Sequence, residues 1–162
     1  MLQIACTPID GSTGHDAAYR LLTELYIAET GANCPEILRT PRGKPYFSDG
    51  LLHFSVSHTP HFAFCALSDR PVGIDAEELT RRIKPDLADK ILSPAEKRRY
   101  EAQTDRNEAL LRFWVLKEAH AKFTGEGLRG YPNKTDFCPD DPRIQILSGC
   151  LVAVIQEDSY AV

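Results

Sequence analysis

Two short segments of the chain carry acidic residues at spacings that suit a metal site. Asp75 and Glu77 stand two residues apart in Gly73–Glu77, and Glu118 lies in the later segment Trp114–Lys122. Side chains at i and i+2 of an extended strand project from the same side, so the first two carboxylates can reach one ion. Three carboxylates without Cys or His describe a hard-cation site. Mg2+ typically takes a few carboxylates together with waters and substrate phosphates.

The second segment also places a cation next to its acid. A helix is expected over 109–123, because this stretch has no Gly or Pro and follows an N-cap signal at Asp105. Glu118 and Lys122 are then one turn apart, and Trp114 lies on the same face one turn earlier. This helix is therefore expected to present a carboxylate, an ammonium and an indole to one site.

Each pattern also has a plainer structural interpretation. Two acids at a strand end usually form a solvated edge, and a Lys-Glu-x-x-x-Lys helix face is usually a surface ion-pair lattice. His58, Lys44 and Arg20, taken singly, are ordinary turn or surface residues. The basic runs 81–84 and 97–99 are most simply solvated faces, although each could receive an acidic partner. The two acidic motifs must be explained together, and this favours a site that carries out chemistry over two unrelated surface features.

The composition is that of one globular unit with a normal core. The chain has 162 residues, 43% of them hydrophobic, and a net charge of -4, which argues against a nucleic-acid binder. No apolar stretch is long enough for a membrane span, and the N-terminus lacks the regions of a signal peptide. The five cysteines are scattered and have no metal-ligand spacing, so a reducing, cytoplasmic setting is expected.

Helices and short strands are expected to position the motifs. The helix over 16–30 contains Arg20 and should stop at Gly31, and Gly43–Tyr46 reads as a turn. A small antiparallel sheet is predicted with Asp75 near its end, from strands at 52–57, 62–67 and 72–77. Further helices are predicted at 85–92 and from a capping box at 93–96, and a closing hairpin from 143–147 and 150–156.

With these two acidic motifs, the chain resembles the 4'-phosphopantetheinyl transferases. Their hallmarks are a G-(apolar)-D-x-E segment and a downstream W-x-x-K-E-(A/S)-x-x-K helix, which here are Gly73–Glu77 and Trp114–Lys122 in that order. The resemblance covers roughly 16–137, because it extends to Gly43–Tyr46, Ser55–Thr59 and Gly125–Leu128.

The resemblance implies an enzyme that transfers the 4'-phosphopantetheine arm of coenzyme A to a serine of an apo carrier protein. Adenosine 3',5'-bisphosphate would be released, with Mg2+ required. Asp75, Glu77 and Glu118 would hold the ion against the pyrophosphate, and Lys122 would add positive charge. Glu118 is the expected base for the serine proton, either directly or through a metal-bound water.

The resemblance also implies contacts to coenzyme A, including its 3'-phosphate. The matching positions are Arg20, Lys44, Ser57 and His58, together with Lys122 near the pyrophosphate. Arginine binds phosphate through two parallel hydrogen bonds, lysine supplies a point charge, and histidine donates from a ring nitrogen.

Among the architectures of this family, the chain resembles the longer surfactin-activator type in a shortened form. This implies an α+β fold of two similar α/β halves related by a pseudo-two-fold, about 1–72 and 73–162, in one monomeric catalytic unit. Val115 and Ala76 depart from the usual family residues, and both are packing changes.

Two other classes of function compete with the enzyme. One is a catalytically silent module that binds coenzyme A or a carrier protein. The other is an α+β interaction domain whose acids bind Mg2+ or Ca2+ structurally. Fatty-acid, polyketide and nonribosomal-peptide carriers all present a serine beside an acidic helix, which a basic surface around Arg98 and Arg99 would suit equally.

Overall fold

The protein has a mixed α+β fold with two three-stranded antiparallel sheets, which confirms the predicted class. The computed structural model describes residues 1–128 and 134–157. Residues 129–133 and 158–162 of the predicted second half lie outside the described residues. The sheets have the orders β1-β5-β4 and β6-β8-β7. The strands are β1 (Leu2–Pro8), β2 (Ile37–Arg39), β3 (Pro45–Phe47), β4 (His53–His58), β5 (Phe62–Ser68), β6 (Val72–Glu78), β7 (Ile144–Leu147) and β8 (Cys150–Gln156). The helices are α1 (Gly14–Thr30), α2 (Leu87–Ile91), α3 (Pro94–Glu101) and α4 (Arg106–Thr124).

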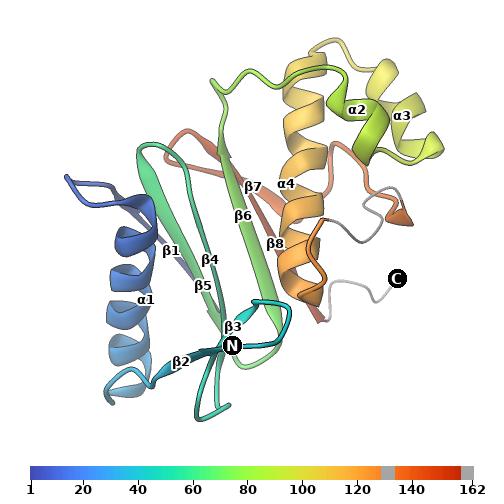
Figure 1. Ribbon diagram of the computed structural model, residues 1–162. Coiled ribbons are helices and arrows are strands. Elements are labelled where there is room, and N and C mark those ends of the chain that lie inside the picture. The colour runs from blue at the N-terminus through green and yellow to red at the C-terminus, as the bar shows by residue number, and fades with distance from the viewer. Residues whose placement is uncertain (129–133, 158–162) are drawn as a thin grey trace.

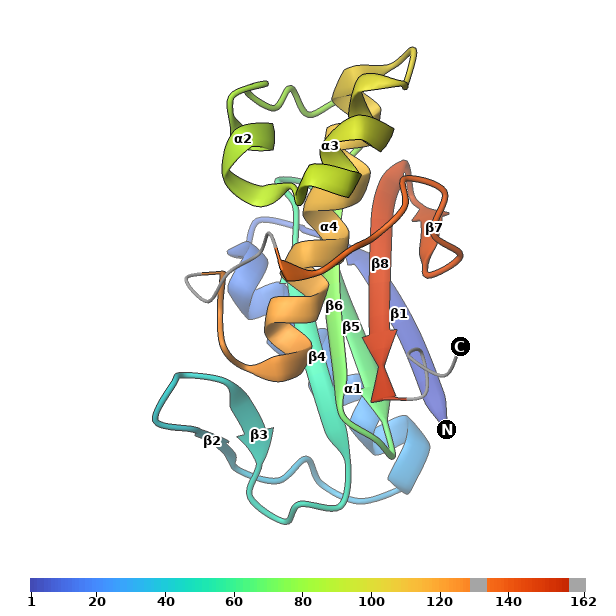
Figure 2. The ribbon, with the colours of Figure 1, turned by 90° about the vertical axis from the view of Figure 1, so that its right-hand side faces the viewer.

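The elements form four layers, with the two sheets in the middle. Figure 1 shows α1, the first sheet, the second sheet and α4 in this order across the molecule. The two-residue period of the strands explains this order, because Cys65 and Leu67 of β5 pack with α1 whereas Phe64 and Ala66 pack with the second sheet. The β2–β3 hairpin projects from one end of the molecule (Figure 2).

The two halves repeat one chain topology. In each half, a first strand, a long helix and two closing strands occur in this order, and the last strand pairs with the first. Thus β5 lies between β1 and β4, and β8 lies between β6 and β7. The β2–β3 hairpin is inserted after the long helix of the first half, and α2 and α3 precede the long helix of the second. The predicted pseudo-two-fold would produce this repetition, but the operator itself and the boundary near residue 72 stay predictions.

The sequence-based expectations were correct for most elements and wrong for one sheet. The predicted single sheet over 52–77 is divided, because β6 pairs with β8 of the closing hairpin instead of joining β4 and β5. Asp75 is consequently the middle residue of β6 and not close to a strand end. Three strands, β1, β2 and β3, were missed, and the helix predicted at 85–92 is shorter.

Local capping explains where the two long helices begin and end. The side chains of Thr13 and Asp105 accept a hydrogen bond from the third residue of α1 and α4, respectively, as N-caps do. Both helices end at a glycine in the left-handed region, Gly31 with φ 69° and Gly125 with φ 73°. None of the described helices is long and apolar enough to span a membrane, and all five cysteines are free thiols.

Candidate functional site

The two sheets meet at a seam made by serine side chains instead of a backbone ladder. Ser55 Oγ of β4 accepts a hydrogen bond from the amide of Ile74 at 3.0 Å, and Ser57 Oγ accepts one from the amide of Ala76 at 3.3 Å. Ser57 Oγ also donates to Asp75 Oδ1 at 2.9 Å. The Asp75 carboxylate is therefore fixed where the two halves join, and its side chain is buried.

A glycine lets α4 lie directly against β6. A Cβ atom on Gly73 would come within 2.1 Å of the Ala119 carbonyl oxygen and 2.5 Å of the Phe123 nitrogen, both backbone atoms. No larger residue fits without moving the helix. This close approach brings the face of α4 that carries Glu118 to the strand that carries Asp75.

The two acidic motifs meet in one cavity of about 350 Å³, here called the acidic cavity. Asp75 and Glu77 of β6 line it together with Trp114, Glu118 and Lys122 of α4. The alternation of the strand predicted that Asp75 and Glu77 share one face of β6, and the helical period predicted that Trp114, Glu118 and Lys122 share one face of α4. The structure brings these two faces together. The first half adds further lining residues, His15, Tyr19, Ser57 and His58.

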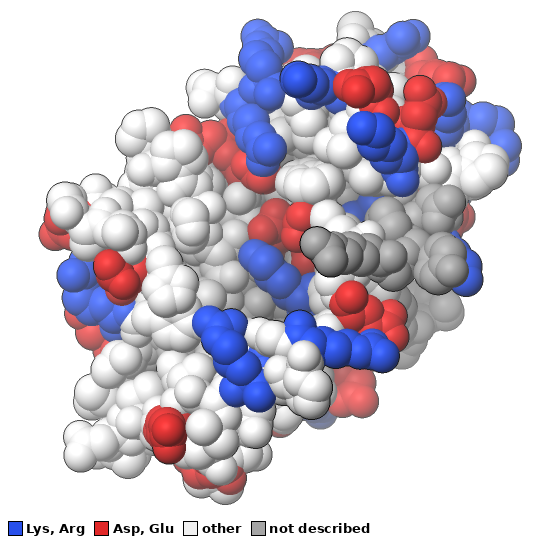
Figure 3. Space-filling model, in the orientation of Figure 1, with Lys and Arg blue, Asp and Glu red and all other residues white. Residues whose placement is uncertain are grey.

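A second cavity of about 350 Å³, the basic cavity, adjoins the first. Arg39, Arg42 and Lys44 from the β2–β3 hairpin line it, and it shares Glu118 and Lys122 with the acidic cavity. Figure 3 shows acidic side chains near the centre of this face of the molecule, with basic side chains above and below them. The two cavities therefore form one groove in which the charge changes sign.

Lys122 lies at the junction of the cavities and uses all three of its ammonium donors within the protein. They donate to Val56 O of β4 at 3.2 Å, to Ile74 O of β6 at 3.1 Å and to Asp75 Oδ1 at 2.8 Å. An ammonium held in this way bridges both sheets. To donate to a ligand phosphate, Lys122 must give up one of these partners.

Glu77 is held by residues of its own half. The indole Nε1 of Trp114, the single tryptophan of the chain, donates to Glu77 Oε1 at 3.0 Å, and Arg81 forms an ion pair with the same oxygen. The carboxylate is largely buried. Trp114 is thus a spectroscopic probe in direct contact with one of the three candidate metal ligands.

Glu118 is the acid whose protonation the site alters most clearly. Burial, followed by the nearby carboxylates of Asp75 and Glu77, raises the pKa of Glu118 from 4.5 to about 7, against the opposing effect of the Lys122 ammonium. Three carboxylates that line one cavity repel one another in this way when no cation lies between them.

The residues fit a magnesium ion whose coordination is completed by a bound ligand. They do not form a complete coordination sphere by themselves. Asp75 Oδ2 is buried and has no hydrogen-bond partner among the described residues, so one carboxylate oxygen is left for a ligand. No group of three or more His, Cys, Asp or Glu residues in the described ranges is arranged to hold a metal ion. Mg2+ commonly uses one or two protein carboxylates plus substrate phosphates, so Asp75 and Glu118 suffice as donors.

The β2–β3 hairpin is attached to the end of α4 across the basic cavity. Lys44 Nζ donates to the Phe123 carbonyl, and Arg42 lies 3.5 Å from the Glu126 carboxylate. Burial lowers the pKa of the Lys44 ammonium. A polyanion in the basic cavity would therefore replace a carbonyl and a carboxylate as partners of these cations.

The remaining predicted contacts divide. Ser57 and His58 line the acidic cavity and not the basic one, and the His58 ring packs so close to Gly14 that an added Cβ would lie 2.5 Å from it. Arg20 lines neither cavity, because its guanidinium is turned to Asp10 Oδ1 at 3.2 Å and Ser12 Oγ at 3.3 Å.

Sequence reasoning missed four lining residues of the first half, His15, Tyr19, Arg39 and Arg42. His15 and Tyr19 are one turn apart on α1 and their rings stack at 4.6 Å, a spacing that the sequence contains. The two arginines carry no such local signal, because only the fold of the hairpin brings them to the groove.

Comparison with known proteins identifies the family. The 4'-phosphopantetheinyl transferase superfamily matches residues 71–157. The 4'-phosphopantetheinyl transferase gsp of Aneurinibacillus migulanus is 33% identical over 88 residues, which are 53% of this chain and 36% of that protein. A 4'-phosphopantetheinyl transferase of Bacillus subtilis is 33% identical over 92 residues, 53% of this chain and 39% of the relative. The 4'-phosphopantetheinyl transferase psf-1 of Bacillus pumilus is 35% identical over 112 residues, 68% and 44% of the two chains.

These matches cover less than half the length of each of the three relatives. The segment that matches the family contains β6 and α4, which carry all three candidate acids, and it makes up more than half of the chain. The chain belongs to the 4'-phosphopantetheinyl transferase superfamily.

Proposed function

We propose that the protein transfers the 4'-phosphopantetheine arm of coenzyme A to a serine of an apo carrier protein and releases adenosine 3',5'-bisphosphate. The observation that carries this proposal is the junction of the acidic and basic cavities at Glu118 and Lys122. A ligand with separate phosphate groups suits such a groove, because cations bind one phosphate while acids and a divalent ion bind another. Coenzyme A has this arrangement, with a pyrophosphate and a 3'-phosphate.

The basic cavity is the proposed place of the 3'-phosphate. Lys44 and Arg42 would release the Phe123 carbonyl and the Glu126 carboxylate and bind the phosphate, with Arg39 beside them. Exchange of a surface carboxylate for a phosphate keeps the charge of Arg42 compensated. His58, at the other end of the groove, would donate to the pyrophosphate.

The acidic cavity is the proposed place of the pyrophosphate and Mg2+. Asp75 and Glu118 would hold the ion, with Glu77 as the third carboxylate, in agreement with the unpartnered Asp75 Oδ2 and the raised pKa of Glu118. A bound Mg2+ would neutralise charge on the transferred phosphorus and on the leaving phosphate. The protein itself contributes mainly position and fixed charge, which supply most of the catalysis of phosphoryl transfer.

Transfer requires a group that takes the proton of the carrier serine as its oxygen bonds to phosphorus and the phosphorus–oxygen bond to adenosine bisphosphate breaks. Glu118 is the proposed base, either directly or through a water. A carboxylate bound to Mg2+ is a weak base, so the route through a water is as well supported as the direct one. Lys122, beside it, would exchange Asp75 for the pyrophosphate and stabilise the leaving group.

One chain would be sufficient for this reaction, because residues of both halves line the groove. The carrier surface would lie near α3, where Arg82, Lys84 and Arg98 are exposed and form no ion pair within the described residues. Arg99, which the sequence also suggested for this surface, is instead bound to Asp136 and the Phe137 carbonyl.

The test is intact mass spectrometry of apo carrier proteins incubated with the protein, coenzyme A and Mg2+. We expect the carrier serine to gain the phosphopantetheine mass, and we expect Glu118→Gln to lower the rate about 1,000-fold. The matched control is Glu108→Gln on the same helix, which loses only an ion pair to Arg112 and should keep the wild-type rate.

Trp114 fluorescence during titration with coenzyme A and Mg2+ separates the outcomes. Binding of both ligands without any mass gain on fatty-acid, polyketide or peptide carriers would replace the enzyme by a silent coenzyme A-binding module. A response to Mg2+ alone, with none to coenzyme A, would leave only a structural metal site.

A further inference from the structure

A buried ion pair lies behind α4, outside both cavities. The side chains of Glu96 on α3 and Lys117 on α4 are almost completely buried, and Lys117 Nζ lies 2.8 Å from Glu96 Oε2. Neither residue lines the groove. The plainer interpretation of the Lys-Glu-x-x-x-Lys face as a surface ion-pair lattice does not hold for Lys117, because this side chain is buried.

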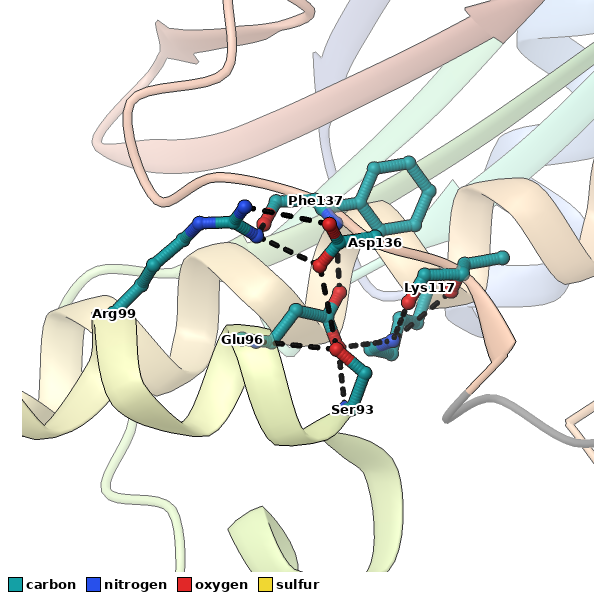
Figure 4. A network of polar contacts seen from close by, with 7 residues as sticks. Ser93, Glu96, Arg99, Lys117, Asp136 and Phe137 are labelled. Atoms are coloured by element: carbon teal, nitrogen blue, oxygen red, sulfur yellow. Dashed lines mark hydrogen bonds and ion pairs between the residues drawn. The ribbon is translucent and has the colours of Figure 1, made fainter.

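The pair is fully integrated in a polar network (Figure 4). Glu96 Oε2 accepts from the Ser93 amide and Glu96 Oε1 from the Phe137 amide, each at 2.8 Å. Lys117 Nζ also donates to Thr135 Oγ1 at 2.9 Å. The network therefore joins three separate parts of the chain, namely α3, α4 and residues 135–137.

The energetics of the pair indicate a role other than stability. Burial removes the hydration of both charges and lowers the pKa of Lys117, although Glu96 opposes this shift. Replacement of a buried ion pair by apolar residues of similar volume is often neutral or stabilising. A fully satisfied buried polar network also fixes the geometry of the groups it joins, and buried polar groups confer such specificity in some systems.

Rotation and translation are the two movements that α4 must not make. At Gly73 of β6 no strand side chain stands between the strand and the helix, and the polar contacts of α4 with β6 are made by Trp114 and Lys122. Lys117 and Glu118 are consecutive, so they point about 100° apart around the helix axis, one to α3 and one into the groove. A bond that fixes Lys117 thus fixes the direction of Glu118.

We propose that Lys117 and Glu96 are positioning residues that set the rotation and axial position of α4, so that Glu118 and Lys122 meet Asp75. This inference rests on the proposed function, since it concerns the same reaction. Misplacement of a reacting group by about 1 Å lowers rates by up to about 100-fold, so a loose α4 costs turnover more than affinity.

The test compares a double variant, Glu96→Leu with Lys117→Met, with the wild-type chain. We expect an unchanged or higher unfolding midpoint, a kcat at least about tenfold lower and a KM for coenzyme A within about threefold. The Trp114 fluorescence change on Mg2+ addition should also shrink, because the Trp114 to Glu77 contact depends on the same helix position. Asp89→Asn is the matched control, since it removes only the exposed ion pair to Lys97 of α3 and should leave kcat unchanged.

A double variant that folds and keeps kcat within about twofold, with the wild-type Trp114 response, overturns the inference. Should the double variant not fold, Thr135→Val decides, because it removes only one acceptor of Lys117. A lower kcat at constant KM supports the positioning role of Lys117 and Glu96, and an unchanged kcat contradicts it. Should the wild-type chain bind coenzyme A without transfer, the proposed function fails. The Trp114 fluorescence response to Mg2+ alone then tests the positioning role of Lys117 and Glu96.

Discussion

The two halves share a topology but contribute opposite charges to the groove. The first half supplies cations, Arg39, Arg42 and Lys44, on a small hairpin, whereas the second supplies the acids Asp75, Glu77 and Glu118 on a strand and a long helix. The second half also adds the Lys122 ammonium at the junction of the two cavities. Neither half alone contains both kinds of group in the arrangement that a phosphorylated ligand needs. The site exists only because the halves meet along the seam.

The binding side chains of the two halves differ in burial as well. Asp75 is buried in the centre of β6, and Glu118 is held on a helix that is capped at both ends. Arg42, in contrast, is mostly exposed, and its ion pair within the described residues joins it to Glu126 at 3.5 Å. The difference agrees with a division of labour, because the chemical step needs precise placement, whereas phosphate binding tolerates long, mobile side chains.

The largest expected effect comes from breaking the contact between β6 and α4. Gly73→Ala places a Cβ against two backbone atoms, so α4 must move away from β6. We expect the free energy of unfolding to fall by about 3 kcal/mol or more, measured by urea denaturation, and transfer to be lost. Gly14→Ala is the comparison, because the three atoms nearest to its Cβ all belong to the His58 side chain and none to the backbone. Equal stabilities of the two variants would contradict the close packing of α4.

The second effect isolates the acidic half through pH. The pKa of Glu118 is about 7 in the folded protein and near 4.5 in the unfolded chain, so the folded state retains the proton over a wider range. The resulting stabilisation is complete below about pH 4.5 and is lost as pH rises through about 7, by about 3 kcal/mol in total. The measurement is the unfolding free energy without Mg2+ from pH 4.5 to 8. Glu118→Gln should lack this component, and parallel pH profiles of both proteins would refute the shift.

The third and smallest effect isolates the basic half. Lys44→Met should raise the KM for coenzyme A about 30-fold, which corresponds to about 2 kcal/mol, with little change in kcat. Dephospho-coenzyme A lacks the 3'-phosphate, so the variant and the wild-type chain should use it equally well. Arg20→Met is the comparison, because Arg20 lines neither cavity and its loss should change nothing. A larger effect of Arg20 than of Lys44 would show that the 3'-phosphate lies elsewhere.

The sequence predicted the parts of the fold that local periodicity encodes. The ends of α1 and α4 and the capping box at Ser93 follow from capping residues that lie beside the helices they close. The separation of β6 from β4 did not follow, because pairing with β8 involves residues nearly eighty positions away. β1 does not alternate regularly, because Ile4, Ala5 and Cys6 are consecutive apolar residues, so the sequence carried little strand signal there.

The candidate site was predicted where two residues share one element. Asp75 with Glu77, and Glu118 with Lys122, are periodic pairs, and all four line the acidic cavity. The surroundings of Arg20 and Lys117 did not follow from the sequence, because tertiary contacts determine them. Arg20 turns to Asp10, and Lys117 is enclosed by α3, and neither contact leaves a pattern in the sequence.

The seam has a consequence for the slow motions of the protein. Two hydroxyl groups, of Ser55 and Ser57, hold the amides of Ile74 and Ala76 where a continuous sheet would use a cooperative backbone ladder. These amides can exchange with deuterium by a local separation of the halves, while both sheets remain intact. Asp75 lies between these two amides, at the seam where the halves would separate. A ligand that contacts both halves closes this seam, so slowed exchange at these two amides would report its binding without any turnover.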